Sequence, residues 1–414
     1  MGIFLGLWAL YYALQWLLLL RQQRAITANG TQIPVGFEDV YAADDQAKAT
    51  AYGLAKLKLA RVELLLEAAL LAWWIPLGGI ASVQHALAAT LPALSSTAPS
   101  VFLSPDFALV VVVFAVGAVV EWPLAAYRTF DVEARFGFNQ STWGLFLKDQ
   151  LLGLALSAVL GVPLLGFVLF AMSSLGTHWW WVAYAVFVAF SLGITVLYPT
   201  VIAPLFNQFK PLDDEALKTT IDALLAEVGF ESKGVFVMDG SRRSTHGNAY
   251  FTGFGRHKRI VFFDTLLERL TPTEIRAVLA HELGHFKLNH IKSQWVLRVF
   301  TLGVGFWVLG QLSLQAWVFQ SLGLTTSPGV VLLTCVLALH LISWPIQPLQ
   351  NAFSRRHEYQ ADAFAVGYSS TDHLASALKK LVRDNASCLV PDRWYARFFA
   401  SHPSVVERVH ALNS

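Results

Sequence analysis

The chain has 414 residues, of which 55% are hydrophobic and only 14% are charged. Soluble globular proteins carry about 25% charged residues. This composition therefore excludes a disordered protein, a coiled coil and a nucleic-acid binder with a basic face. It predicts an α-helical protein that crosses a membrane several times and carries a soluble part. The two cysteines, Cys335 and Cys388, are too few for a disulfide framework.

Seven stretches are apolar over the length, about 20 residues, that a helix needs to cross a bilayer. In chain order they cover residues 2–20, 62–81, 107–127, 151–173, 179–205, 295–318 and 330–349. The first stretch lacks a basic leader and a small-residue cleavage site, so we expect a retained span and not a signal peptide.

The positions of the cations predict which side of the membrane each loop faces. The loops at 82–106, 174–178 and 319–329 contain no Lys or Arg. All 30 cations except Arg298 lie in the loops at 21–61, 128–150 and 206–294 or in the tail from 350. Because cytoplasmic loops carry the excess of Lys and Arg, this strict alternation predicts an N-terminus outside and a C-terminus in the cytoplasm.

Three carboxylates lie within or beside the predicted spans. Glu63 and Glu67 are four residues apart near the start of the second span, so they share one helix face, and Glu121 lies late in the third span. Charged groups inside a membrane are costly and usually face a partner or a cavity. Two interpretations stay open: these side chains reach lipid headgroups, or they face an internal water-filled space.

The predicted spans divide the chain into four parts. These are an N-terminal membrane region with five spans, a cytoplasmic block, two further spans and a second cytoplasmic block, at residues 1–205, 206–294, 295–349 and 350–414. Neither block has the composition of a linker, so both are expected to fold.

The first block carries recognisable elements. Apolar spacing predicts a helix over 213–228, and short apolar runs predict strands over 234–238 and 259–263, with 248–253 as a third candidate strand. Thr271-Pro272-Thr273-Glu274 is a capping box with proline at the first helical position. The helix that it opens is expected to continue to about His290.

That helix contains His281-Glu282-Leu283-Gly284-His285, an H-E-x-x-H sequence. Histidines four residues apart project from one helix face, so their imidazoles can converge on one Zn²⁺. The glutamate between them can then act as a general base toward water at the metal. A solvated helix with two chance histidines is the alternative, and the capped helix between two spans disfavours it.

A catalytic zinc takes a third protein ligand and keeps a fourth position open. In the second block, a helix over 354–362 would place Glu358 and Asp362 on one face. Glu358 could then be the third ligand, with Asp362 holding a ligand histidine by a hydrogen bond. His357 and His290 compete for the ligand role, and His290 is the poorer candidate because a continuous helix would place it about 140° beyond His285.

Taken together, these segments resemble the integral-membrane, zinc-dependent CAAX prenyl proteases. Residues 281–290 resemble the core motif of that family, and 358–362 resemble its E-x-x-A-D element. The segments 133–139, 204–207, 248–251 and 401–403 match as well, in the family's order. The resemblance implies seven transmembrane helices that enclose a chamber. It also implies a cytoplasmic zincin-like α+β metalloprotease domain built from two segments.

The resemblance also implies the metal chemistry. His281, His285 and Glu358 would hold one Zn²⁺ per chain. Glu282 would be the catalytic base, and later the acid that protonates the leaving amine.

Further residues around the metal take roles from the resemblance. Asn248, Ala249 and Tyr250 would belong to a strand that pairs with the substrate backbone by strand addition. Asp362, His290 and Arg408 would be polar neighbours of the metal. Either Arg408 or His290 would stabilise the oxyanion.

We therefore expect a zinc-dependent, membrane-embedded endopeptidase resembling the protease that removes the last three residues of prenylated CAAX proteins. Its partners would be a peptide or protein substrate, with or without a prenyl group, and the lipid bilayer, but no nucleic acid. The short loops and the lack of a C-terminal dilysine signal favour a bacterial inner membrane over the ER membrane. One alternative is a housekeeping protease that degrades misfolded or damaged membrane proteins. A minor alternative is a non-catalytic zinc-binding scaffold or transporter.

Overall fold

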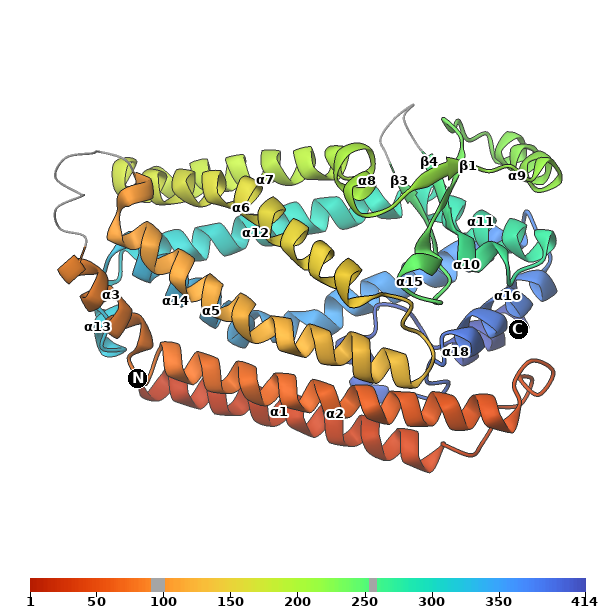
Figure 1. Cartoon of the computed structure of the whole chain (residues 1–414), viewed down its shortest axis with the longest axis horizontal. Helices are drawn as coiled ribbons and strands as arrows, with labels where there is room; N and C mark the ends of the chain where they lie inside the picture. Colours follow the sequence, from red (N-terminus) through yellow and green to blue (C-terminus); the bar gives the residue numbers. More distant parts are fainter. Residues whose placement is uncertain (91–100, 253–258) are drawn as a thin grey trace.

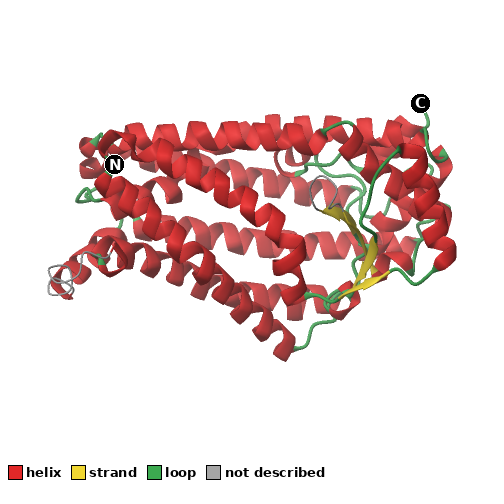
Figure 2. Ribbon diagram, turned by 90° about the horizontal axis from the view of Figure 1, so that it is seen from above, coloured by secondary structure: helices red, strands yellow, loops and turns green. Residues whose placement is uncertain are grey.

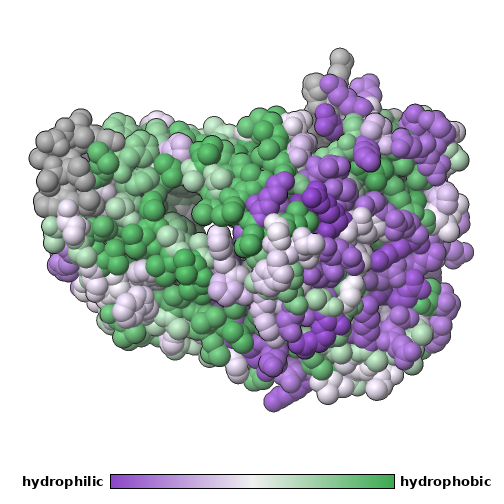
Figure 3. All heavy atoms as spheres, in the orientation of Figure 1, coloured by the Kyte–Doolittle hydropathy of each residue, from purple (hydrophilic) through white to green (hydrophobic). Residues whose placement is uncertain are grey.

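The computed structural model describes residues 1–90, 101–252 and 259–414. Long helices follow the long axis of the molecule, and a small sheet lies near one end (Figures 1 and 2). Apolar residues dominate the visible face over these helices, whereas polar residues gather over the end with the sheet (Figure 3). The N-terminus lies at the apolar end and the C-terminus at the polar end (Figure 1).

Six segments of the described chain are long and apolar enough to cross a membrane: Gly2–Ala28, Pro105–Glu133, Trp143–Ser174, Gly176–Phe206, His290–Ser313 and Pro328–Val366. They correspond to six of the seven predicted spans. The seventh, at 62–81, falls on a pair of helices, α2 (Ala43–Trp74) and α3 (Gly79–Thr90), which are bent by 50° relative to each other. Gly78 has a φ of 79° at the bend, a conformation that glycine adopts at little cost. Part of the predicted loop at 82–106 lies outside the described residues.

The spans and the connections beside them contain the following elements, of which η1 and α13 lie outside the spans. They are α1 (Gly2–Ala28), η1 (Val101–Leu103), α5 (Pro105–Tyr127), η2 (Arg128–Glu133), α6 (Trp143–Ser174), η3 (Gly176–His178), α7 (Trp179–Leu197), η4 (Tyr198–Ile202), α8 (Ala203–Phe206), α12 (His290–Ser313), α13 (Ala316–Ser321), α14 (Pro328–Ser343), η7 (Trp344–Ile346) and α15 (Gln347–Val366). Since α14, η7 and α15 follow one another directly, the last span continues as a helical rod well beyond residue 349, where it was predicted to end.

The membrane helices differ in how far other parts of the protein bury them. In the spans containing α7 and α12, only 6% of the most apolar window is buried, against 33% in the span containing α14. Many residues of α7 and α12 are therefore only partly covered by protein, although these two helices lie side by side. Figure 3 shows a gap between side chains in the apolar half. These observations are compatible with the chamber that the resemblance predicts.

The four-stranded sheet has the order β1-β2-β4-β3, from β1 (Phe209–Pro211), β2 (Val235–Met238), β3 (Ala249–Thr252) and β4 (Arg259–Phe263). Strands β2 and β4 are parallel, and the other two pairs are antiparallel. The three predicted strands are confirmed, although Gly253, at the end of the third, lies outside the described residues. Strand β1 was not predicted.

Helices surround this sheet, and the predicted helix at 213–228 is confirmed as α9 (Glu215–Val228). The others are η5 (Gly240–Arg242), α10 (Asp264–Leu267), α11 (Pro272–Lys287), α16 (Thr371–Asp384), α17 (Arg393–Phe399) and α18 (Val405–Leu412). Helix α11 carries the H-E-x-x-H sequence. Its predicted capping box is present, since Thr271 accepts a hydrogen bond from the Glu274 amide and Glu274 accepts one from the Thr271 amide.

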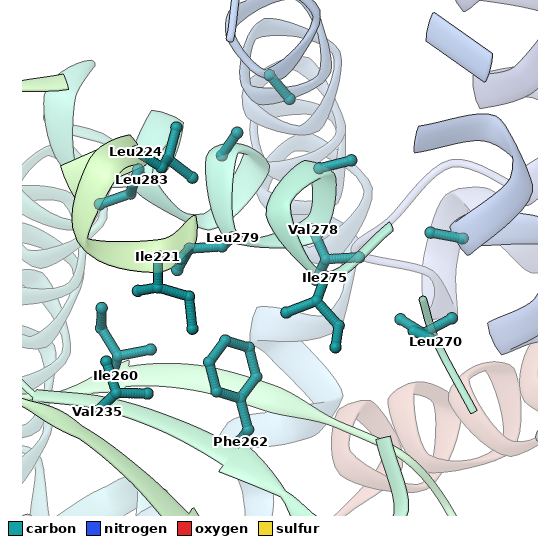
Figure 4. Close-up of a cluster of buried hydrophobic side chains, with 14 of the residues drawn as sticks. Ile221, Leu224, Val235, Ile260, Phe262, Leu270, Ile275, Val278, Leu279 and Leu283 are labelled. Carbon is teal, nitrogen blue, oxygen red and sulfur yellow. The ribbon is translucent and has the colours of Figure 1, made fainter. Parts of the chain in front are cut away.

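A dense apolar core fixes α11 in place (Figure 4). Ile275, Leu279 and Leu283 project from α11 toward Ile260 and Phe262 of the sheet and toward α9, and all five side chains are at most 2% exposed. On the other side α11 packs against α15 and α16. Side chains in such a core occupy fixed rotamers, so the helix that carries both motif histidines is held rigidly.

The expectation that α11 continues to His290 is wrong. The helix ends at Lys287, Asn289 adopts a left-handed φ of 57°, and α12 begins at His290. Asparagine tolerates this conformation better than most residues. The angle of about 140° between His285 and His290, which assumed a continuous helix, therefore does not apply.

Each of the three carboxylates lies near an ionisable side chain, on another helix for Glu63 and Glu67 and in the same span for Glu121. Glu63 pairs with Arg128, and Glu121 Oε1 lies 3.6 Å from Nη1 of the same arginine. Glu67 Oε1 lies 3.5 Å from His340 Nε2 on α14. Both interpretations stay open, because the side chains of Glu67 and Glu121 are half-exposed and His340 balances Glu67 only when it is protonated.

Candidate metal centre

Three side chains from two helices converge on one point. His281 and His285 lie one turn apart on α11, Glu358 comes from α15, and one ligand atom of each lies within 4.8 Å of the others. The two Nε2 atoms are 3.2 Å apart, and the Glu358 oxygens lie 3.6 Å from His281 Nε2 and 3.4 Å from His285 Nε2. Two imidazoles and one carboxylate are a donor set found in catalytic zinc sites.

The buried Glu358 oxygen Oε2 also fits a metal. Among the described residues this atom is buried without a hydrogen-bond donor, although the side chain is only 5% exposed. A buried carboxylate normally has its oxygens satisfied by donors or a cation. The three residues thus fit a divalent cation.

Asp362 and Arg408 fix the orientation of His281. Asp362 Oδ1 lies 2.8 Å from His281 Nδ1, and Arg408 donates to both Asp362 oxygens at 2.5 and 2.8 Å. The carboxylate requires a proton on Nδ1, so Nε2 presents its lone pair to the other ligands. Burial would lower the pKa of His281, but the contacts with Asp362 and Glu358 outweigh it and raise the pKa to about 9. A metal ion that binds Nε2 would therefore displace a proton from it.

His285 is oriented by a different chain of hydrogen bonds. Its Nδ1 lies 3.1 Å from His290 Nδ1, and His290 Nε2 lies 3.0 Å from Gln360 Oε1. Because the amide oxygen can only accept, His290 carries its proton on Nε2 and accepts from His285 through Nδ1. The lone pair of His285 Nε2 therefore also faces the ligand cluster. Burial, followed by the neighbouring His281, lowers the pKa of His285 to about 4.

The other proposed ligand, His357, lies outside the cluster. Its ring stacks on His290 at a centroid distance of 4.0 Å. In the described chain, the one group that could hold a metal consists of His281, His285 and Glu358.

Glu282 lies beside His281 and completes the motif. Burial is the largest influence on this carboxyl and, with the nearby negative charge of Glu358, it raises the pKa of Glu282 against the opposing effect of His281. A carboxyl with a raised pKa is suited to accept a proton and later return it.

His402 is a residue to which the sequence assigned no role. Its Nε2 lies 3.4 Å from Glu358 Oε1, its Nδ1 lies 2.9 Å from Ser401 Oγ, and the side chain is 63% exposed. The segment 401–403 was noted only as part of the resemblance. No spacing rule links a histidine 44 residues beyond Glu358 to the ligands, so only the tertiary structure reveals this contact.

Strand β3 places the predicted substrate-binding residues at the edge of the sheet. Asn248 and Phe263 form a hydrogen-bonded pair, so the backbone groups of Ala249 point away from β4, toward the open edge. In contrast, Tyr250 Oη lies 3.9 Å from Met238 Sδ across the sheet, away from the ligands. Phe251 contacts Phe286, which follows His285, at a centroid distance of 5.2 Å. The edge therefore lies next to the metal helix.

Comparisons with known proteins agree with this geometry. One family model, the CAAX prenyl protease N-terminal region with five membrane helices, matches residues 22–208, and that of peptidase family M48 matches residues 211–414. The CAAX prenyl protease 1 homolog of Oryza sativa subsp. japonica is 38% identical over 300 residues, covering 71% of this chain and 70% of the relative. The CAAX prenyl protease 1 of Saccharomyces cerevisiae is 35% identical over 312 residues, covering 71% and 69%.

A solved structure extends the likeness to the whole chain. The crystal structure of S. mikatae Ste24p has a TM-score of 0.90 and 29% identity, covering 100% of this chain and 98% of that one. Membership of a peptidase family rules out the minor alternative of a non-catalytic scaffold or transporter. The chain belongs to the CAAX prenyl proteases of peptidase family M48 and is a multi-pass membrane metalloendopeptidase.

Proposed function

We propose that the protein binds one Zn²⁺ per chain at His281, His285 and Glu358 and hydrolyses peptide bonds with Glu282 as general base. The observation that carries this proposal is the convergence of the three ligand atoms within 4.8 Å, beside a carboxyl with a raised pKa. When bound, zinc supplies Lewis-acid polarisation and lowers the pKa of water.

Side chains of the protein then transfer the proton and stabilise the negative charge that develops on the substrate. Glu282 takes a proton from the attacking water and returns it to the nitrogen of the leaving amine. His402 Nε2, on the same side as the ligand atoms, donates to the developing oxyanion. Arg408 and His290 each touch the Nδ1 atom of a ligand histidine. We therefore assign them to positioning and not to the oxyanion.

The edge of β3 offers a place for the substrate backbone. Since no strand of the described chain pairs with its open side, an extended peptide can add there, with Ala249 and Phe251 supplying the backbone groups. The Ala249 amide donates to Asn248 Oδ1 at 2.8 Å, and we infer that a substrate carbonyl replaces this side chain. This mode requires no particular side chain on the substrate, and we assign Tyr250 only a backbone role.

We further propose that the substrate is the C-terminal region of a protein, with or without a prenyl group, that reaches the site through the space inside the bundle. The N-terminus would lie outside and the C-terminus in the cytoplasm, in a bacterial inner membrane or in the ER membrane. A housekeeping role on damaged membrane proteins uses the same chemistry. Equal cleavage of a farnesylated peptide and its unlipidated copy would favour that role.

The Glu282→Gln variant tests the mechanism. It keeps the ligands and the shape of the side chain but removes the base, so kcat should fall by about 10²–10⁴-fold. Zinc content, measured by atomic absorption, should stay at one per chain. An active Glu282→Gln enzyme would overturn the assignment of Glu282 as the base, and a purified wild-type protein without bound zinc would overturn the metal site.

A further inference from the structure

Two segments of the sequence match the family but lie away from the metal ligands: 133–139, between α5 and α6, and 204–207, at the end of the fifth span. In the structure both meet the protease half at one place. This is the turn at 243–246, which follows η5 and leads into β3. The convergence of two distant segments on one short turn calls for a physical reason.

Arg243 is the first anchor of this turn. Its guanidinium donates to both carboxylate oxygens of Asp149 on α6, at 2.8 and 3.0 Å. It also donates to Asn207 Oδ1 at 3.1 Å and to the Phe206 carbonyl at 2.7 Å. Bidentate pairing fixes the guanidinium plane as well as its position, so the turn is tied to the cytoplasmic ends of two membrane helices.

His246 is the second anchor. Its Nε2 lies 3.2 Å from Glu133 Oε2, and its ring stacks on Phe138 at a centroid distance of 4.3 Å. Tyr52 of α2 donates to the other Glu133 oxygen at 2.5 Å, and His246 Nδ1 lies 2.9 Å from Asn385 Oδ1. The histidine is thus held on every side by groups from the membrane half and from the end of α16.

The backbone of the turn is bound as well. The Gln140 amide donates to the Arg243 carbonyl at 3.0 Å, and the Thr245 amide donates to the Phe138 carbonyl at 3.1 Å. Between these bonds Asn139 and Ser244 face each other as an antiparallel bridge. The loop between α5 and α6 therefore adds a short strand-like partner to the chain just before β3.

Hydrogen bonds connect the turn to the residues at the start of β3, so the position of the turn determines the position of the strand. Thr265 donates to the His246 carbonyl at 2.9 Å, and the Phe263 amide donates to the Asn248 carbonyl at 3.0 Å. His246 is only three residues from Ala249, whose backbone groups face the open edge. A shift of the turn would therefore move the edge, while the ligands on α11 and α15 would stay held by their own core.

We propose that the membrane half positions the peptide-binding edge of β3 through this turn, with Arg243 and His246 as positioning residues for substrate binding. The inference rests on the proposed role of β3 in binding the substrate backbone. Weakening the turn should impair peptide binding and leave the hydrolytic step largely intact, because nothing in the turn touches a metal ligand or Glu282.

Steady-state kinetics on a fluorescent farnesylated CAAX peptide and on its unlipidated copy test this. Glu133→Gln and His246→Gln should each raise KM about 10-fold on both peptides while kcat changes less than about twofold and zinc content stays at the wild-type value. Their effects should not add in the double variant, because they break the same contact. Lys218→Gln, which removes an exposed ion pair with Glu215 on α9, is the matched control and should leave KM unchanged.

A rescue experiment separates positioning from a general loss of structure. Facing residues of an antiparallel bridge without their own hydrogen bonds have Cα atoms about 4.5 Å apart, which a disulfide can span. In the Glu133→Gln background, Asn139→Cys with Ser244→Cys should restore wild-type KM when oxidised and lose it again on reduction. Each single cysteine variant should not respond to oxidation.

The outcomes distinguish the two proposals. If the wild-type enzyme does not cleave the peptides, the proposed function fails. If the wild-type enzyme cleaves them but the Glu133→Gln and His246→Gln variants retain wild-type KM, or lose kcat alone, only the positioning role fails. A disulfide that forms without lowering KM would also overturn it.

Discussion

The two halves of the molecule are built on opposite packing rules. In the protease half, Phe262 and Leu283 are completely buried and the metal helix lies between the sheet on one side and α15 and α16 on the other. In the membrane half, the spans with α7 and α12 are 6% buried in their most apolar windows. Metal ligands must be held within a fraction of an ångström, whereas enclosing a substrate requires space. The halves therefore differ because rigidity serves one task and openness the other.

The ionisable groups of the two halves also differ in how many contacts each of them makes. In the membrane half, Arg128 contacts Glu63 and Glu121, and Glu67 contacts His340 on α14. Around the metal, Asp362 and Arg408 form a buried network in which each charged group makes several contacts. Charged groups that each make several buried contacts rigidify their surroundings, and this suits the ligands and not the bundle.

Removing a ligand is expected to have the largest effect. Glu358→Gln replaces an anionic donor by a neutral amide in the cluster. The site should lose most of its zinc and the several kcal/mol of charge stabilisation that the metal provides, which corresponds to a fall in kcat/KM of about 10³-fold or more. Zinc content and peptide hydrolysis measured on the same preparation check this. Full zinc occupancy in the variant would mean that Glu358 is not a ligand.

A pair of leucine substitutions tests the packing contrast directly. Leu279→Ala, at a site that is 1% exposed in the protease core, should lower stability by about 2–5 kcal/mol. Leu192→Ala, at a site on α7 that is 43% exposed, leaves no cavity and should cost less than about 1 kcal/mol. Thermal unfolding in the same detergent compares the two variants. Equal losses would contradict the difference in burial between these two sites.

Much of the fold follows from local patterns that the sequence displays. Spans are set by length and hydropathy, and α11 is set by the capping box at Thr271 and Glu274. The end of α11 was not predictable in this way, because apolar spacing continues past Lys287 and only the left-handed Asn289 breaks it. Strand β1 is also hidden in the sequence, since its three residues acquire a strand conformation only through pairing with β2.

The candidate site also contains residues that the sequence predicts and residues that it does not. The spacing of His281 and His285 on one helix predicts their convergence, because a helix has a fixed period. Glu358, on a helix 73 residues further along the chain, was one of three candidates for the third ligand, and only the resemblance selected it. His402 and Gln360 were missed, because their contacts arise from the tertiary packing of loops and helices. No periodic pattern in the sequence predicts such contacts.

An intermediate effect is expected at the hydrogen-bond chain behind His285. His290→Leu removes the acceptor that holds the His285 ring, so zinc affinity should fall about 10–100-fold. Competition with a chromophoric chelator measures this without relying on activity. Gln360→Leu should change affinity in the same direction and by less, because it acts one step further from the ligand. An unchanged affinity in both variants would show that the core alone orients His285.

The smallest expected effect is the loss of stability when Glu274, whose charge links α11 to α16, is neutralised. Glu274 is buried, and although burial would raise its pKa, the bonds from Lys380, Ser376 and Thr271 prevail and hold the pKa below its ordinary 4.5. A carboxyl whose pKa is lower in the folded state stabilises the fold above pH 4.5, and this stabilisation is lost as pH falls through the lower, folded value. Glu274→Gln can still cap the helix but lacks the charge. It should therefore cost about 1 kcal/mol at pH 7 and flatten the acid side of the stability profile. The matched variant Lys380→Gln should flatten the same part of the profile. A profile that keeps its wild-type slope in both variants would assign the link between α11 and α16 to apolar packing alone.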